Sequence, residues 1–369
     1  MDDFILEFER AAAKVSWESL DHAGGSAGDT PSMLRSLWEG PTDTAAPYMH
    51  LWSDLLGESR VWSATAPAAY LLSILVRDGR FGGDDKTLRE GVFVFFRELA
   101  LRRRSEQTPR SPVSSIVELV TPAPEAACGL VIPTLLEVEL SFVDDPDSRL
   151  ASCAATAAVA AVTTSQSSFP SQRRTLIKSL KARVQWTGSS ADRAGALLDL
   201  GRLGESLSDF LSSQEWAIRL AAALGSADLS NQRALDVILD AACRPGELDT
   251  LLSPPGDSNW MTLPQLGGRP LSVVVAEETC SRVKDLALLV QPLVSATRSI
   301  GGPMGRLVAR PYYRKLFPAG LPPVDISSLP QREVAHFLAS SDEVWGQASL
   351  QRLLADLKLP VSRDEWQRL

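Results

Sequence analysis

Arginine and lysine gather in two long stretches of the sequence that contain no acidic residue. Residues 148–191 hold six cations without Asp or Glu, and residues 286–324 hold five cations without Asp or Glu. Cations without acidic neighbours repel one another, so their clustering predicts a surface that recognises an anionic group. The alternative is that both stretches form ordinary solvated helix faces. The candidate binding residues are Arg173, Arg174, Lys178, Arg298, Arg306, Arg310, Arg314 and Lys315.

Three arginines of the second stretch have a regular spacing. Arg306, Arg310 and Arg314 are four residues apart, so on a continuous helix they share one face. Pro311 removes one donor from the helix ladder, and the helix therefore either continues through it or ends near Arg310. The three side chains stay close in space in both cases.

Residues suited to acid–base or metal chemistry are scarce. The chain has three histidines, and its four cysteines are far apart without any C-x-x-C pair. Cys128 and Cys153 lie in alanine-rich helical runs, where cysteine acts as a small buried hydrophobe. We therefore predict no catalytic, metal-binding or cofactor-binding residue, and we expect none of the cysteines to be a nucleophile or a ligand.

Two further features resemble functional motifs. Residues 24–28, Gly-Gly-Ser-Ala-Gly, match G-x-S-x-G, but a nucleophile elbow needs a strand before it and an acidic helical pattern precedes this one. We interpret residues 23–29 as a flexible loop.

Of the nine tryptophans, most are expected in the core. Trp260 is the exception, because it lies in a Pro/Gly-rich segment where it either folds back as a plug or faces a ligand.

Apolar residues recur at helical spacing along most of the chain, so the elements that position these residues are expected to be helices. Leu88, Val92, Phe95, Phe96 and Leu99 form one stripe, which predicts a helix over roughly 86–102. The best strand candidate, 273–275, is short and isolated. The sequence therefore predicts an all-α fold.

Two helix starts are predicted from capping patterns. Asp145-Pro146 is typical of an N-cap followed by proline at the first helical position. Ser340 with Glu343 is typical of a capping box that opens the last long helix.

A helix-pair unit recurs along the chain. In residues 130–162 a helix containing Pro133 is followed by an Asp-rich turn, by Arg149 and by an alanine-rich second helix. Arg219 repeats the position of Arg149 after 70 residues, about two helix pairs later, and Pro67 is placed like Pro133. Such pairs bury their apolar faces by stacking, which predicts a right-handed α-solenoid of about eight to ten pairs.

The pattern of kinking proline, Asp-rich turn and arginine resembles HEAT repeats, and more narrowly a family of actinobacterial HEAT-repeat proteins of similar length. Three segments carry the resemblance: residues 61–75, with Ala64-Thr65-Ala66-Pro67; residues 130–162; and residues 329–366. The family often has His-Gln-Gly before the first segment, where this chain has Gly57-Glu58-Ser59. The resemblance implies a solenoid and a binding role, without a settled reaction.

The expected organisation has three parts. A HEAT-like solenoid covers 1–252, a Pro/Gly-rich loop covers 253–270, and a helical block over 271–369 continues or caps the solenoid. No apolar run reaches the roughly 20 residues of a membrane helix, and the acidic start MDDFILEFER is unlike a signal peptide. We therefore expect a cytoplasmic protein that does not contact a membrane, and the resemblance implies a bacterial one.

Composition narrows the classes of function. The net charge is −8 and the pI about 5.1, which disfavours non-specific binding to DNA. We expect a non-enzymatic scaffold whose concave surface engages an unknown protein partner, and neutralising or regulating that partner is one role that fits. Two alternatives stay open: a HEAT-like nucleic-acid-binding protein that uses 148–191 and 286–324, and an enzyme that acts on a small molecule in the solenoid groove.

Overall fold

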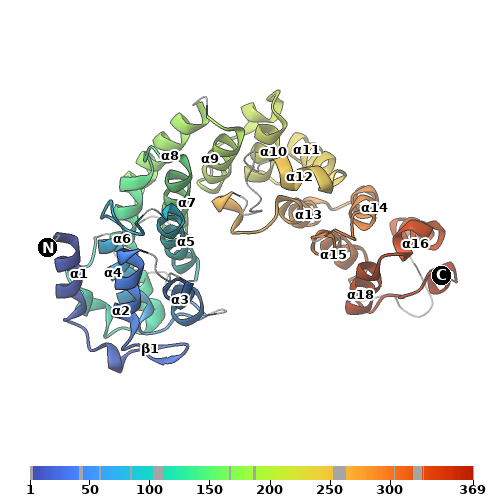
Figure 1. Ribbon diagram of the computed structural model, residues 1–369. Coiled ribbons are helices and arrows are strands. Elements are labelled where there is room, and N and C mark those ends of the chain that lie inside the picture. Colours follow the sequence, from blue (N-terminus) through green and yellow to red (C-terminus); the bar gives the residue numbers. More distant parts are fainter. Residues whose placement is uncertain are drawn as a thin grey trace. The chain divides into compact units, whose positions relative to one another are not determined.

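The computed structural model is all-α, as the sequence predicts. It describes residues 3–40, 45–57, 60–83, 85–102, 111–165, 168–185, 188–251, 263–302, 304–318, 326 and 328–368. These residues form nineteen α-helices, several short 3₁₀ or π segments and one two-stranded antiparallel hairpin (Figure 1). The chain divides into two compact units, residues 1–185 and 186–369. None of the described helices is long and apolar enough to cross a bilayer.

Unit 1 contains the hairpin and the first eight α-helices. Its hairpin consists of β1 (Asp21–His22) and β2 (Gly25–Ser26), and a π-helix, η2 (His50–Leu55), follows α3 directly. The 3₁₀ segments are η1 (Trp17–Ser19) and η3 (Ile116–Leu119). The helices are α1 (Asp3–Ala12), α2 (Thr30–Glu39), α3 (Ala45–Met49), α4 (Thr65–Leu75), α5 (Lys86–Arg102), α6 (Pro124–Phe142), α7 (Ser148–Thr164) and α8 (Pro170–Gln185).

The core of unit 1 is built around α7. Every residue of this helix from Leu150 to Val162 is buried, because α5, α6 and α8 pack against it. Seven alanines leave little side-chain volume, so the neighbouring helices approach closely. This helix is the alanine-rich second helix that the sequence predicts after Arg149. The predicted helix over 86–102 is also confirmed, since α5 has these bounds.

Unit 2 contains the remaining helices. They are α9 (Ser190–Arg202), α10 (Trp216–Gly225), α11 (Gln232–Ala242), α12 (Pro245–Leu251), α13 (Leu271–Arg282), α14 (Val290–Arg298), α15 (Gly305–Leu316), α16 (Leu329–Ser340), α17 (Asp342–Trp345), α18 (Ala348–Asp356) and α19 (Arg363–Gln367). Three 3₁₀ segments, η4 (Ser208–Ser212), η5 (Pro264–Leu266) and η6 (Leu286–Leu289), lie between them. The predicted strand 273–275 lies inside α13, where all three valines are buried.

Close backbone contact joins α9 to α10. A Cβ atom at Gly201 would lie 2.1 Å from the carbonyl oxygen of Gly225, so only glycine fits at this crossing. Nearby, the buried carboxylate of Asp199 accepts hydrogen bonds from Gln265 Nε2 at 2.8 Å and from Arg202 Nη1 at 3.2 Å. These bonds hold the η5 segment against α9 and satisfy a carboxylate that has no exposed surface.

The helix starts differ from the capping predictions. The N-cap of α7 is Asp147, whose side chain accepts from the N–H groups of Arg149 and Leu150, whereas Asp145 accepts from the N–H of Asp147. In unit 2, α16 ends at Ser340, and its capping box is formed by Ser328 and Gln331. Both predicted starts were therefore wrong. The helices that follow Ser340 are α17 and α18, whose N-cap residues Ser341 and Gln347 make no side-chain capping hydrogen bond.

Candidate functional site

The basic helix α15 is continuous through Pro311. It runs from Gly305 to Leu316, so the alternative of a break near Arg310 is wrong. Its inner side is apolar and buried, and consists of Val308, Ala309, Tyr312, Tyr313 and Leu316. Burial raises the pKa of both tyrosines, so their hydroxyls stay neutral. The charge of α15 therefore lies on its outer side alone.

The outer side of α15 carries two rows of residues, which we call the α15 face. The first row is Arg306, Arg310 and Arg314, and the second is Leu307, Pro311 and Lys315. Arg306, Arg314 and Lys315 are exposed, and Leu307 exposes 48% of its surface. Within the described ranges, no carboxylate oxygen lies within 4.0 Å of a cation on this face.

Several other arginines of unit 2 form ion pairs with acidic side chains. Arg193 pairs with Glu215 at 2.7 Å, and Arg282 pairs with Glu278 at 3.0 Å. Arg310, in addition, has its Nε shielded from solvent without an acceptor among the described residues. The α15 face is therefore a row of cations without an acidic partner among the described residues of its unit.

Tight packing fixes where the α15 face begins. A Cβ at Gly305 would lie 2.4 Å from Ile300 Cα and 2.5 Å from Ser299 O, so the start of α15 presses against the end of α14. On the buried side, the hydroxyls of Tyr313 and Thr297 lie 3.2 Å apart and join the two helices. The helix that carries the cations is thus anchored along its whole length.

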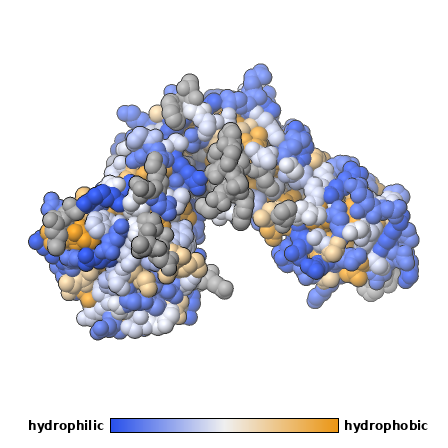
Figure 2. Space-filling model, in the orientation of Figure 1, coloured by the Kyte–Doolittle hydropathy of each residue, from blue (hydrophilic) through white to orange (hydrophobic). Residues whose placement is uncertain are grey.

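Arg298 does not belong to the α15 face. It is the last residue of α14, where a cation is favoured by the helix dipole, and its guanidinium lies 5.7 Å from the ring centre of Phe337. Trp260 lies outside the described residues. Figure 2 shows that both units present mainly hydrophilic surface in this view, with apolar areas interspersed.

The first basic stretch is partly compensated by the fold. Arg149 pairs with Glu90 of α5 at 2.6 Å, and Arg183 donates to the carbonyl oxygen of Ser148 at 3.0 Å. Burial raises the pKa of Glu90, although its pairing with Arg149 opposes the shift. The residues predicted to bind, Arg173, Arg174 and Lys178, lie on α8, and Arg174 and Lys178 are exposed. Binding of an anionic group by this stretch stays a prediction, although Arg149 has an acidic partner within its own unit.

The structure also brings together two histidines for which the sequence indicates no role. His22 of β1 and His50 of η2 are both buried, and their ring centres lie 5.0 Å apart in an edge-to-face arrangement. His22 Nε2 lies 3.1 Å from Asp29 Oδ1, and His50 Nδ1 lies 2.9 Å from Asp54 Oδ2. We call these four residues the histidine cluster.

Hydrogen bonds assign one tautomer to each imidazole of the histidine cluster. The N–H of Gly24 donates to His22 Nδ1 at 2.9 Å, so a neutral His22 carries its proton on Nε2 and donates to Asp29. His50 donates from Nδ1 to Asp54, and its Nε2 accepts from the hydroxyl of Thr30 at 3.1 Å. Both rings are fully hydrogen-bonded in this arrangement.

Thr30, His50 and Asp54 have the order of a hydroxyl–imidazole–carboxylate triad. The hydroxyl of Thr30, however, belongs to a residue with no exposed surface, so no substrate reaches it in this structure. Ser26 of the G-x-S-x-G match lies on β2, in a hairpin rather than the expected loop, and its hydroxyl donates to the carbonyl of Glu18 at 3.0 Å. Neither hydroxyl is placed as a nucleophile.

The π-helix that carries His50 is held at its end by side chains. Thr65 Oγ1 donates to Leu55 O at 2.6 Å, and Arg102 Nη1 donates to Gly57 O at 2.6 Å. These bonds satisfy carbonyl groups that no helix continuation reaches. The π geometry is rare and occurs often at functional sites. Apolar periodicity and capping patterns do not predict it, which is why His50 and Asp54 were missed.

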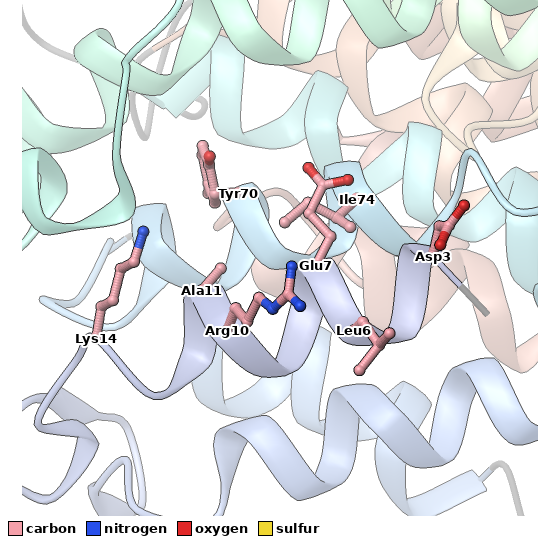
Figure 3. Close-up of a pocket in the computed structure, with 8 residues that line it drawn as sticks. All are labelled: Asp3, Leu6, Glu7, Arg10, Ala11, Lys14, Tyr70 and Ile74. Carbon is pink, nitrogen blue, oxygen red and sulfur yellow. The ribbon is translucent and has the colours of Figure 1, made fainter. Parts of the chain in front are cut away.

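Two open pockets lie in unit 1, and neither is lined by a residue of the histidine cluster. One, of about 480 Å³, lies between α1 and α4, and Figure 3 shows Glu7, Arg10, Lys14 and Tyr70 around it. The other, of about 530 Å³, is lined by Arg89 and by Asp145 and Asp147 of the turn between α6 and α7. Charges of both signs surround each pocket, so neither selects a ligand of one charge.

Cys128 and Cys153 lie in the core, as the sequence predicts, whereas most of the described tryptophans are only half-buried. Cys128, Cys153 and Cys280 are buried, and burial raises the pKa of each thiol to about 12, which keeps it protonated at neutral pH. Trp17 and Trp366 are buried and donate to backbone carbonyls of their own units. These side chains serve the core.

Comparison of the chain with protein-family models, curated proteins and solved structures finds no match. The resemblance to HEAT-repeat proteins therefore stays a prediction. The α15 face and the histidine cluster are the two arrangements of side chains from which a function can be inferred.

Proposed function

We propose that this protein is a non-enzymatic binding scaffold and that its α15 face contacts an acidic surface of a protein partner. The observation that supports this is the row of Arg306, Arg310 and Arg314 on one rigid helix without a carboxylate nearby among the described residues. Like charges in a row repel one another, and a partner that brings carboxylates relieves the repulsion.

The proposal includes a helical-repeat architecture. Within unit 1, α4 packs on α6 and α5 on α7, and within unit 2, α9 packs on α10 and α10 on α11. Packing between near neighbours in sequence is typical of helical repeats, and it supports a HEAT-like, right-handed solenoid of about eight to ten pairs. The proposed location is the cytoplasm of a bacterial cell.

The second row of the α15 face favours a protein over a nucleic acid. Leu307 and Pro311 place an apolar strip beside the arginines, and arginine next to apolar surface is typical of protein hot spots. The arginine row spans only about 12 Å of helix, which is short for tracking a nucleic-acid backbone. The net charge of −8 adds repulsion from a polyanion.

A charge-reversal experiment tests the proposal. The tagged parent protein and the double variant Arg306→Glu/Arg310→Glu are used to capture partners from native cell extract. A captured acidic protein is then purified, and its association rate is measured at several salt concentrations. We expect the variant to associate about tenfold more slowly and with a weaker salt dependence. Folding should change little, because exposed charges contribute little to stability.

The matched control is Arg174→Glu/Lys178→Glu on α8, which makes the same change in net charge in unit 1. A uniform electrostatic effect would slow both double variants equally, and that result would contradict a specific role for the α15 face. Binding of a duplex DNA oligonucleotide that is weakened in both double variants would favour the nucleic-acid alternative instead, because that alternative uses both basic stretches.

A further inference from the structure

We propose that the histidine cluster of unit 1 binds one divalent transition-metal ion through His22, His50 and Asp29. This site is independent of the α15 face and was not expected from the sequence. One ring nitrogen of each histidine and one carboxylate oxygen of Asp29 lie within 4.8 Å of one another. Two imidazoles and one carboxylate are a donor set that Zn²⁺ and its first-row neighbours bind, whereas Mg²⁺ and Ca²⁺ prefer oxygen alone.

The donor spacing is close to what a metal ion requires. Tetrahedral bonds of about 2.0–2.1 Å place neighbouring ligand atoms about 3.3 Å apart. His22 Nε2 and Asp29 Oδ1 are already 3.1 Å apart. Since His50 Nδ1 is bonded to Asp54, the other nitrogen, Nε2, is the one available to a metal. The site needs side-chain shifts of little more than about 1 Å, and the backbone can stay in place.

Residues around the proposed site orient its ligands and offset the charge of the metal ion. Asp54 accepts from His50 Nδ1 at 2.9 Å, which is the carboxylate–histidine arrangement that orients metal ligands. The carboxylates of Asp29 and Asp54 together offset the +2 charge of the ion. Asp29 is exposed, so the ion can enter from solvent on its side, and a water molecule can take the fourth position.

Metal binding must displace existing hydrogen bonds. His22 would move its proton from Nε2 to Nδ1, so the imidazole stays neutral and no proton is released. The N–H of Gly24 would then lose its acceptor, but Gly24 is exposed and its N–H can turn to water. Thr30 would lose His50 Nε2 as an acceptor. Each lost bond is a small net contribution, whereas bonds to a transition-metal ion are far stronger.

The test is a titration of the EDTA-treated full-length protein with CoCl₂, followed by absorbance in the visible range, and with ZnCl₂, followed by calorimetry. We expect one equivalent of metal per chain. The variants His22→Ala and Asp29→Asn should each lose the visible Co²⁺ bands, and Asp54→Asn should weaken affinity about 10- to 100-fold. His336→Ala is the control and should bind as the parent does, because His336 is exposed on α16 of unit 2.

Thermal unfolding gives a second measurement of metal binding. It remains informative even if the His22→Ala variant does not fold. ZnCl₂ should raise the melting temperature of the parent protein and leave that of Asp29→Asn unchanged, since Asp29 is exposed and its replacement does not disturb the core. The proposal is overturned if metal-free parent protein takes up no equivalent of either ion. It is also overturned if binding survives in Asp29→Asn, or if it is lost only when the cysteines are replaced.

Discussion

Glu139 of unit 1 is an acidic residue that is almost completely buried. It lies in α6, which packs against α4, α5 and α7, and it exposes 1% of its surface. Its Oε2 has no hydrogen-bond partner among the described residues, and burial raises the pKa of Glu139 well above the ordinary value of 4.5. A buried polar group without a partner costs about 1–3 kcal/mol. We therefore expect Glu139→Leu to stabilise unit 1 at pH 7 by about that amount.

The pH dependence follows from the sign of the shift. An acid with a raised pKa binds its proton more tightly in the folded state than in the unfolded chain. Its contribution to stability is fully present below pH 4.5 and declines as the pH rises from 4.5 toward the folded-state pKa. In that window the free energy of unfolding falls by about 1.4 kcal/mol per pH unit. Glu139→Gln removes this slope, because an amide does not titrate.

The assay is urea unfolding followed by far-UV circular dichroism at several pH values above 4.5, with the transition of unit 1 analysed separately. Glu137→Gln is the control, because Glu137 lies on the same helix and is exposed. Equal changes of the pH slope in Glu139→Gln and Glu137→Gln would refute the assignment of the slope to Glu139. Destabilisation by Glu139→Leu would refute it as well, because that result would indicate a partner for the carboxyl group.

Three further predictions concern other parts of the fold. Gly201→Ala should destabilise unit 2 by about 3 kcal/mol or more, because the added Cβ meets the carbonyl of Gly225 at 2.1 Å, and a thermal melt checks this. Asp78→Asn should lower stability at pH 7 but little at pH 2. Hydrogen bonds from Arg80 lower the pKa of Asp78 to about 2, so its contribution is present above the unfolded value of 3.8 and is lost as the pH falls. Urea curves at the two pH values test this. A thiol reagent should label native protein at half-buried Cys243, and the buried cysteines only after unfolding, as peptide mass mapping would show.

Short-range periodicity was enough to predict α5. The stripe from Leu88 to Leu99 indicated the bounds of α5, because a helix of that length needs only its own apolar spacing to be recognised. Arg306, Arg310 and Arg314 likewise share a face because they share one helix. The effect of Pro311 could not be predicted, since the packing of the inner side decides whether a helix continues through a proline.

Features that depend on distant residues could not be predicted either. The basic stretch from 148 to 191 looked uncompensated, but Glu90, which pairs with Arg149, lies 59 residues away. Arg219 matches Arg149 in the repeat, yet it donates to the carbonyls of Ser213 and Gln214 instead of to an acid. A pattern along the chain therefore indicates residue type and helix position, and the tertiary fold decides the partner.

The histidine cluster shows the same limit at a site. His22 and His50 are 28 positions apart in the sequence, and the elements that bring them together are a short two-stranded hairpin and a π-helix. Neither element has a periodic apolar signal. The sequence offered one cue. Two of the three histidines each have an aspartate a few residues later, namely Asp29 after His22 and Asp54 after His50.

The burial of α7 on all sides has a consequence for how unit 1 opens. An amphipathic surface helix can exchange its amide hydrogens through local fraying, but α7 has no solvent-facing side between Leu150 and Val162. Its amides become accessible only when α5, α6 or α8 moves away. The slowest hydrogen–deuterium exchange in unit 1 should therefore occur in α7, and the exchange rate there would report the global opening of this unit directly.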